Sequence, residues 1–280
     1  MSRLWGEDSD ALAQAGVDVA SLAQLEDELS SVLVLDDAPI VDAHVHLGRD
    51  ADGHNLTAHE LARDLDRWGI AAAVCFPAND PGPGGQFTEA NDLVLAAARS
   101  APERIVPFCR VDPNGDWALE LERAAEAGAR GLKLHPVGQS FRPEADESVA
   151  AVSVATERGW PVLFHAGFGA RRLGGPLAEL AGAVPDARLI LAHGGRGDAR
   201  ALAHEFAGES RIAFDTSLAT VTDLAALSPG QLMFGSDRPY GEHASALHLI
   251  AATAGVAGWT DAEVRDVLGG NLTRWLDDQG

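Results

Sequence analysis

Positive charge is scarce in this sequence. Of its 280 residues, 21 are lysine or arginine and 42 are aspartate or glutamate, which gives a formal net charge of −21 at pH 7. A surface with this charge repels the phosphate backbone of nucleic acids and the anionic headgroups of membranes. We therefore expect a small-molecule substrate, and neither a nucleic-acid nor a membrane partner.

Long hydrophobic runs are also missing. No apolar segment approaches the roughly 20 residues that a membrane-spanning helix needs. The first ten residues, MSRLWGEDSD, are acidic and lack the apolar stretch of a signal peptide. These two absences predict a cytoplasmic protein.

Cysteine occurs only twice, as Cys75 and Cys109. Both lie inside apolar runs, AAAVCF and RIVPFC, where a free cysteine commonly acts as a small core hydrophobe. Structural disulfides are rare in the cytoplasm, so we expect two free, buried thiols.

Lysine occurs once, as Lys133, and every other basic residue is arginine. Lysine carries a compact amine whose pKa falls on burial, which lets it react with carbonyl compounds or CO₂. A lone lysine can also be an accident of codon usage. Its position in the apolar segment GLKLH favours a role in a site.

The segment VDAHVHL, residues 41–47, contains the first candidate ligands. Apolar and polar residues alternate with a period of two, which predicts a strand with His44 and His46 on one face. Residues two apart on a strand lie roughly 6.5 Å from each other, so two imidazoles can converge on one metal ion. An isolated HxH pattern is weak support, and the rest of the chain has to strengthen it.

Eight short apolar runs recur along the chain, each followed by a turn and an Ala- and Leu-rich amphipathic segment. They cover residues 41–47, 71–76, 104–109, 131–135, 161–165, 188–193, 211–215 and 231–235. Eight strand–helix units of this spacing close into a parallel barrel of about 250 residues. We predict an α/β fold, a distorted (β/α)8 TIM barrel over residues 38–280.

Residues 1–37 are predicted to form a separate N-terminal helical appendage. Val19, Leu22, Leu25, Leu29 and Val32 make an apolar stripe at helical spacing, and Asp18 is suited to cap the helix. Such a helix packs on the barrel or on a second subunit, and a homodimer is a hypothesis that rests on this segment alone.

Polar residues with metal-binding chemistry lie where the predicted strands end. They are His44 and His46, Lys133 and His135, His165, His193, and Asp237 in FGSDRP. The carboxyl ends of barrel strands meet on one face, and closure places the last strand beside the first. Singly, such a histidine is more often a structural core group, and such an aspartate more often a helix cap. Their joint placement favours a site.

The remaining histidines have no partner motif and are interpreted as ordinary surface residues. They are His54, His59, His204, His243 and His248.

Several motifs resemble the metal-dependent amidohydrolase superfamily, in particular its amidohydrolase-2 group, which includes aminocarboxymuconate semialdehyde decarboxylase and related hydrolases. The segments that carry the resemblance are DAHVHLG, GLKLHPVGQSFRP, VLFHAG, LILAHGG, FGSDRPYG and GGNLTRWL. They run from about residue 38 to the C-terminus, in the order HxH, Lys and His, His, His, Asp.

The resemblance implies one divalent metal ion, for which we expect Zn²⁺, bound by His44, His46, His165 and Asp237. His193 then either binds a second ion or contacts the substrate. In relatives with two ions the corresponding lysine is carboxylated and bridges them. Lys133 therefore has two alternative roles, as a carboxylated bridge or as a substrate-binding group.

A metal of this kind lowers the pKa of bound water to about 7, which supplies hydroxide for attack on a carbonyl carbon. We expect Asp237 to take the water proton and pass it to the leaving group, and His193 to stabilise the oxyanion or to help position the nucleophile. His135 shares a strand face with Lys133 and is a candidate substrate-binding residue.

Three arginines suggest a small carboxylate-bearing substrate, because arginine binds carboxylates through two parallel hydrogen bonds. Arg171 and Arg172 follow the fifth strand, and Arg238 follows Asp237. Alternatively, these side chains are solvated or paired with acidic residues.

Three functions follow from these residues. Hydrolysis of an amide, ester or lactone is favoured, since a metal hydroxide and an aspartate base serve it directly. Non-oxidative decarboxylation of a small carboxylic acid is the alternative, and the chain is short for that group. The third is an inactive barrel used as a binding subunit, against which the complete set of ligands argues.

Overall fold

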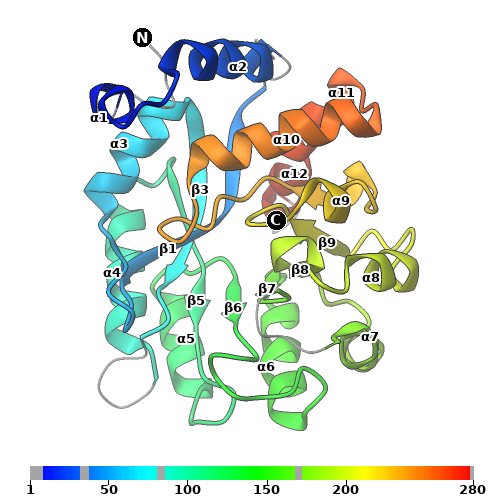
Figure 1. Ribbon diagram of the computed structural model, residues 1–280. Coiled ribbons are helices and arrows are strands. Elements are labelled where there is room, and N and C mark those ends of the chain that lie inside the picture. Colours follow the sequence, from blue (N-terminus) through cyan, green and yellow to red (C-terminus); the bar gives the residue numbers. More distant parts are fainter. Residues whose placement is uncertain (1–8, 32–37, 81–85, 168–171, 278–280) are drawn as a thin grey trace.

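The computed structural model describes residues 9–31, 38–80, 86–167 and 172–277, and in them strands and helices alternate as a TIM barrel (Figure 1). The strands are β1 (Ile40–Arg49), β2 (Asn55–Leu56), β3 (Ile70–Pro77), β4 (Ile105–Pro107), β5 (Cys109–Arg110), β6 (Leu132–Leu134), β7 (Val162–Phe164), β8 (Leu189–Leu191), β9 (Ile212–Asp215) and β10 (Leu232–Met233). All eight predicted apolar runs contain strands, and residues 104–109 hold the short β4 and the start of β5.

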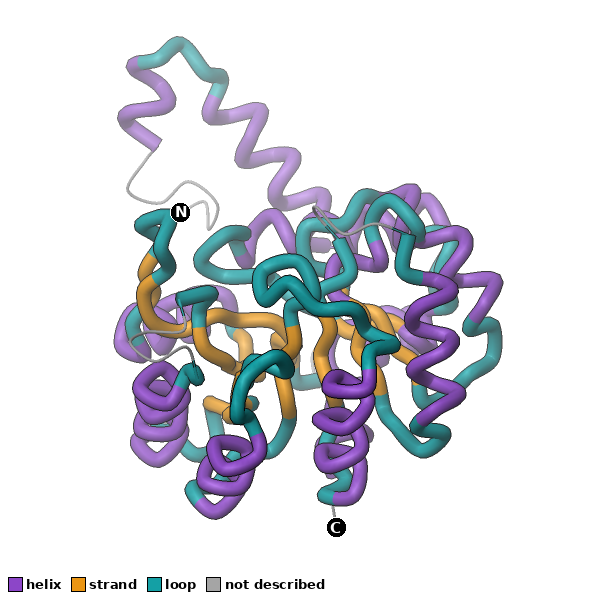
Figure 2. Tube along the Cα trace, turned by 90° about the horizontal axis from the view of Figure 1, so that it is seen from below, coloured by secondary structure: helices purple, strands orange, loops and turns teal. Residues whose placement is uncertain are grey.

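Helices surround these strands (Figure 2). They are α1 (Ser9–Gln14), α2 (Val19–Ser31), α3 (Ala58–Trp68), α4 (Thr88–Ser100), α5 (Ala118–Glu126), α6 (Asp146–Glu157), α7 (Gly174–Ala183), α8 (Ala199–Glu205), α9 (Val221–Leu224), α10 (His243–Ala257), α11 (Asp261–Arg265) and α12 (Asn271–Asp277). Short turns of other helix types are η2 (Ala192–Gly195), η3 (Pro229–Gln231) and η4 (Asp266–Gly270). None of the helices in the described ranges is both long and apolar enough to cross a membrane.

Parallel pairing runs around the barrel. One sheet has the order β2-β1-β3-β4, in which only β2 is antiparallel, and the other has the order β10-β9-β8-β7-β6-β5. Backbone hydrogen bonds connect the last strand region to β1, since Ala43 donates to Phe234, His46 to Arg238, and Asp237 to His44, at 2.7 to 2.8 Å. The predicted closure, which brings Asp237 beside the two histidines of β1, is therefore present.

The alternation of β1 changes phase halfway along the strand. Val41 and Ala43 belong to the smaller apolar cluster inside the barrel, whereas Val45 belongs to the larger cluster under the helices. A register shift against β3 lies between Asp42 and Val45. Such a bulge redirects side chains. Because of the bulge, the side chains of the consecutive residues Ala43 and His44 both face the barrel interior. Simple alternation along the strand did not predict this.

The cysteine prediction is confirmed. Cys75 and Cys109 are free and buried. Burial raises the pKa of the Cys109 thiol to about 12, so the thiol stays protonated and unreactive.

Outside the barrel, helix α2 covers residues 19–31, and the Asp18 carboxylate accepts hydrogen bonds from the backbone of Ala20 and Ser21 at 3.1 Å, as expected of an N-cap. The helix lies beside α10 (Figure 1). Val32, Arg171 and residues 81–85 of the loop after β3 lie outside the described residues.

Candidate active site

The first part of the site is built on β1. His44 and His46 are 0 % and 5 % exposed, and their Nε2 atoms lie 3.2 Å apart. Asp237, from the loop after β10, places its Oδ1 atom 3.1 Å from His44 Nε2 and 3.2 Å from His46 Nε2. These three ligand atoms lie within 4.8 Å of one another, which allows them to bind one metal ion.

The Asp237 Oδ1 atom, which lies between the two imidazoles, accepts no hydrogen bond in the described residues. Asp237 Oδ1 is buried and makes no hydrogen bond of proper geometry within the described residues, although it contacts both imidazoles. A buried carboxylate oxygen without a donor is costly unless a cation meets it. The donor set therefore fits a divalent cation of the kind that imidazole and carboxylate ligands hold.

Asp215 at the end of β9 is a site residue that sequence reasoning missed. Its Oδ2 atom lies 2.8 Å from His44 Nδ1, and its Oδ1 atom accepts hydrogen bonds from the backbone of His193 and Ser217 at 3.2 and 3.0 Å. A carboxylate at Nδ1 holds the proton on that nitrogen and leaves Nε2 free to bind a metal. The aspartate that closes RIAFD was the available signal, since it ends a strand as the other candidates do.

Lys133 lies next to His44. It is completely buried on β6, with Nζ 3.4 Å from His44 Nε2 and 4.6 Å from the ring of Phe76. Burial lowers the pKa of the Lys133 amine to about 7, so a large share of it is uncharged at neutral pH. Its placement beside the ligand atoms is as expected, and its carboxylation stays a prediction.

We call His44, His46, Asp215 and Asp237 the carboxylate cluster. Burial tends to raise the pKa of Asp237, but His44 and His46 outweigh it and hold that pKa well below the usual range. Burial lowers the pKa of His46 to about 3. At neutral pH the carboxylate is therefore ionised and His46 is neutral, which are the protonation states that bind metal.

His44 differs from His46 because two carboxylates face it. Burial and Lys133 lower its pKa, yet Asp215 and Asp237 raise it further, so the net shift is upward. The negative charges of the two carboxylates thus favour a positive charge next to the His44 ring.

The other three strand-end histidines form a separate group, which we call the imidazole cluster. His193 Nε2 lies 3.1 Å from His165 Nδ1, and the ring of His135 stacks on that of His165 with centroids 3.9 Å apart. Burial lowers the pKa of His193 to about 4 and that of His135 further. In the described residues, His165 belongs to neither set of three converging metal-ligand atoms, whereas His193 joins His44 and Asp215 in one of them.

Two of the site residues have unusual backbones. His193 and Asp237 adopt the left-handed region, with φ of 60° and 59°. Side chains other than glycine rarely do so, and such strain is common at functional sites.

A cavity of about 410 Å³ opens above both clusters. It is lined by His46, Asp50, Ala51, Asp52, Asn79, His135, His165, His193, Leu218, Asp237 and Tyr240. The space suits a small molecule, which would contact the predicted ligands at the barrel's strand ends.

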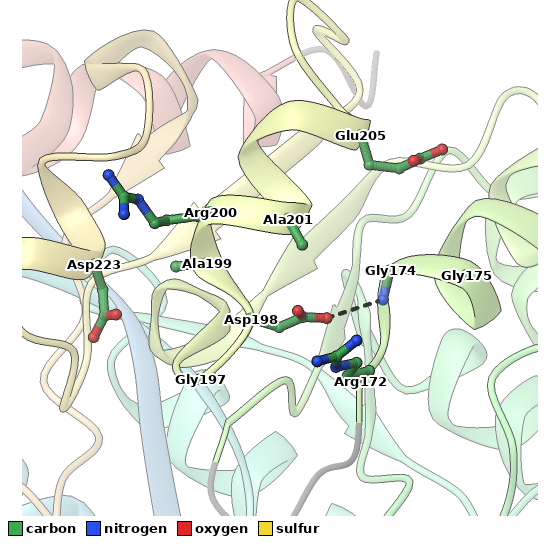
Figure 3. A pocket seen from close by; sticks show the side chains of 10 residues that line it. All are labelled: Arg172, Gly174, Gly175, Gly197, Asp198, Ala199, Arg200, Ala201, Glu205 and Asp223. Atoms are coloured by element: carbon green, nitrogen blue, oxygen red, sulfur yellow. Dashed lines mark hydrogen bonds between the residues drawn. The ribbon is translucent and has the colours of Figure 1, made fainter.

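The arginines predicted to bind a carboxylate do not line this cavity in the described structure. Arg238 forms ion pairs with Asp64 at 2.6 Å and Glu242 at 2.8 Å. Arg172 lines a different cavity, about 610 Å³ in volume, between the starts of α7 and α8 (Figure 3). There, Asp198 accepts a hydrogen bond from the backbone of Gly174. Arg171 lies outside the described residues.

His243 corrects the surface interpretation of the remaining histidines. It is 1 % exposed, and its Nε2 atom lies 3.0 Å from Asp42 Oδ2. Asp42 also accepts hydrogen bonds from the backbone of His44 and Ser236, at 2.9 and 3.0 Å. The error arose because α10 packs its first turn on β1, which a local sequence pattern does not reveal. His54, His59 and His204 are exposed as expected.

Comparison with known proteins gives a family match and a fold match. Residues 41–277 match the family model described as Amidohydrolase. No curated protein matches the sequence significantly.

Several solved structures share the fold. An uncharacterised TIM-barrel protein from Bordetella bronchiseptica has a TM-score of 0.68 and 15 % identity, covering 86 % of this chain and 99 % of its own. The 5-carboxyvanillate decarboxylase LigW from Sphingomonas paucimobilis has a TM-score of 0.66 and 14 % identity, covering 86 % and 99 %. A probable 2-pyrone-4,6-dicarboxylic acid hydrolase from Acinetobacter baumannii has a TM-score of 0.62 and 16 % identity, covering 85 % and 99 %.

Proposed function

This chain belongs to the amidohydrolase family, in its amidohydrolase-2 group, and from that premise we propose that it is a metal-dependent hydrolase of a small amide, ester or lactone. Family and fold relatives make it an enzyme, and both hydrolases and decarboxylases occur among those relatives. One observation carries the proposal: His44, His46 and the Asp237 oxygen, which makes no hydrogen bond in the described part of the chain, converge within 4.8 Å below a cavity of small-molecule size.

We assign one divalent ion to His44, His46 and Asp237, with Zn²⁺ as the expected metal. When bound, such an ion polarises a carbonyl group and makes water a strong nucleophile near neutral pH. His165 is kept as a further candidate ligand, because its ring lies beside His193 on the same floor of the cavity. A second ion bridged by carboxylated Lys133 is the alternative stoichiometry.

The chain's own residues divide the remaining work. Asp237 accepts a proton from the attacking water at its carboxylate and delivers it to the leaving atom. Asp215 holds His44 in one tautomer and orientation through the 2.8 Å contact at Nδ1. His193 lines the cavity, and its Nδ1 is engaged by the Ser217 backbone oxygen at 3.1 Å. A proton on Nδ1 leaves Nε2 as an acceptor, so the neutral His193 ring serves to position a donor group.

The proposal that the substrate carries a carboxylate is supported by two proteins of the same fold, whose names refer to 5-carboxyvanillate and 2-pyrone-4,6-dicarboxylic acid. The described lining of the cavity contributes Asp50 and Asp52 and contains no arginine or lysine. We therefore propose that any substrate carboxylate points toward the metal or Lys133, and that the part of the substrate facing Asp50 and Asp52 is uncharged.

The test begins with the metal content of freshly purified protein, measured by plasma mass spectrometry. We expect about one ion per chain, lost on chelation together with turnover of lactones, esters or amides, and restored with the metal. A His59→Ala variant controls for incidental histidine binding, since His59 is exposed and is not among the residues that line the cavity. Absence of metal after reconstitution would refute the proposal.

Decarboxylation is the second candidate, favoured by the fold shared with LigW. It needs a proton delivered to carbon instead of a nucleophile delivered to a carbonyl. Carboxylated aromatic compounds belong in the substrate panel for this reason. Release of CO₂ without incorporation of ¹⁸O from labelled water into the organic product would replace the hydrolase proposal by the lyase.

A further inference from the structure

Three residues of the cavity lining are not used by the proposed chemistry. Asp50, Asn79 and Tyr240 lie beside the metal ligands and are joined to one another, because Asp50 Oδ2 accepts hydrogen bonds from the Asn79 backbone, at 3.2 Å, and from the Tyr240 hydroxyl. Asn79 and Tyr240 therefore meet at a single carboxylate oxygen.

Arg110 fixes the orientation of the Asn79 amide. The Arg110 Nη2 group donates a hydrogen bond to Asn79 Oδ1. Because a guanidinium has donors only, the amide oxygen has to face it and the amide nitrogen has to face away. Asn79 Nδ2 makes no hydrogen bond in the described part of the chain, so it is left as a free donor beside the cavity.

Arg110 cannot easily move from this position. It is completely buried, its Nη1 group donates to the Ala78 backbone at 3.2 Å, and its guanidinium lies 4.7 Å from the centre of the Phe87 ring. Gly138 leaves room for the amide, because a Cβ atom at that position would lie 3.1 Å from Asn79 Oδ1 and 3.3 Å from Asn79 Nδ2.

Tyr240 offers the cavity a hydrogen-bond acceptor, whereas Asn79 offers a donor. Its hydroxyl proton is directed to Asp50, since an ionised carboxylate accepts hydrogen bonds and cannot donate them. The tyrosine oxygen therefore offers lone pairs to a ligand, as an acceptor.

We propose that Asn79 and Tyr240 form a donor–acceptor pair that recognises an uncharged amide-type edge of the substrate, with its carbonyl oxygen at Asn79 Nδ2 and its N–H at Tyr240 Oη. Arg110 is a positioning residue for this pair. The inference rests on the proposed function for the identity of the cavity, and it narrows the substrate class to molecules with adjacent acceptor and donor groups, such as amides, lactams or imides.

Alternative ligand edges fit this pair less well. A carboxylate presents two acceptors, so one of its oxygens would face the lone pairs of Tyr240. An amidinium presents two donors, so one of its nitrogens would face Asn79 Nδ2. A site with a fixed donor and a fixed acceptor discriminates against both, because one buried polar group is left unpaired.

Three ligands of equal shape test the proposal: benzamide, benzoate and benzamidinium. Their affinities for the metal-loaded protein are measured by calorimetry. Each variant is compared with wild type as a ratio of affinities, so that any contact of benzoate with the metal cancels. Tyr240→Phe removes the acceptor, and we expect the benzamide-to-benzoate ratio to fall by about tenfold. Asn79→Asp replaces the donor by an acceptor, and we expect preference to shift from benzamide to benzamidinium by about tenfold or more.

Glu126→Gln is the control, because it also removes one negative charge but lies at the exposed end of α5, outside the cavity lining. We expect it to change the benzamide affinity by less than about twofold. Arg110→Met should also reduce the preference for benzamide over the two other ligands, because the side-chain amide of Asn79 can then rotate and exchange the positions of its oxygen and nitrogen. Circular dichroism checks that this variant folds, and the other two variants decide the question if it does not.

Affinity ratios that stay within about twofold of wild type in both Tyr240→Phe and Asn79→Asp would overturn the inference, since each change removes one member of the pair. Binding does not depend on turnover. A protein that loses the amide preference in the variants yet hydrolyses nothing would thus contradict the proposed reaction and leave the recognition pair standing.

Discussion

The carboxylate cluster and the imidazole cluster differ in charge although both are buried histidine sites at strand ends. His44 and His46 share their surroundings with two ionised aspartates, whereas His135, His165 and His193 mainly face one another. Asp215 accepts a hydrogen bond from the His193 backbone N–H, and its carboxylate also lies within 4.8 Å of a His193 ring nitrogen. The first group therefore requires a cation, and the second is stable as neutral rings. Histidine content alone does not mark a metal site; the carboxylates do.

Removal of one ring from each cluster should give the largest contrast. We expect His44→Ala to lose the bound metal, since it deletes a ligand atom and exposes two carboxylates to each other. His135→Ala should keep its metal, because His135 lies outside both groups of converging ligand atoms. Plasma mass spectrometry of the two variants, purified side by side, measures this. Equal metal loss would remove the distinction between the clusters.

Asp237→Asn tests the carboxylate that serves as both ligand and base. The amide keeps the size of the side chain but cannot accept the water proton, so kcat/KM should fall by about a thousandfold. Steady-state kinetics on the best substrate of the panel gives this number, and metal content is measured on the same sample. A variant with full activity would remove Asp237 from the mechanism.

Asp215→Asn should have a smaller effect, because Asp215 acts through His44. Loss of the charged partner at Nδ1 leaves the ring free to change tautomer, and metal affinity should fall by about 10- to 100-fold. Competition with a chromogenic chelator measures the affinity. Ser217→Ala is a useful comparison, since Ser217 also donates to Asp215 and lies 3.4 Å from His44 Nδ1 but brings no charge to that ring. Similar losses in both variants would indicate a purely structural role.

The pH dependence of stability should show the smallest effect. Burial lowers the pKa of His193 to about 4 from an ordinary value near 6.5, so the unfolded chain binds this proton first. The stabilisation is complete above about pH 6.5 and is lost as the pH falls toward 4, at up to about 1.4 kcal/mol per pH unit. In metal-free protein, urea unfolding of His193→Gln should show a correspondingly weaker pH dependence than wild type. Identical slopes would mean that His193 is not buried as a neutral ring.

The barrel and most members of the site follow from the amino-acid pattern alone. Continuous apolar runs indicate parallel strands that are buried on both faces, and strand ends in a closed barrel lie on one face. That reasoning was sufficient to bring His44, His46, Lys133 and Asp237 together across the chain.

The orientation of the side chains and the identity of their partners depend on the packing of distant segments. The register shift in β1 turned His44 inward, and the packing of α10 buried His243 against Asp42. Arg238 forms an ion pair with Asp64, 174 residues away in sequence, and lies outside the cavity lining. Arg110 orients Asn79, and Asp50 orients Tyr240. Local patterns report which residues are apolar or polar along one element. A hydrogen bond or ion pair depends on two side chains that packing brings together from distant segments, and therefore only the folded chain specifies it.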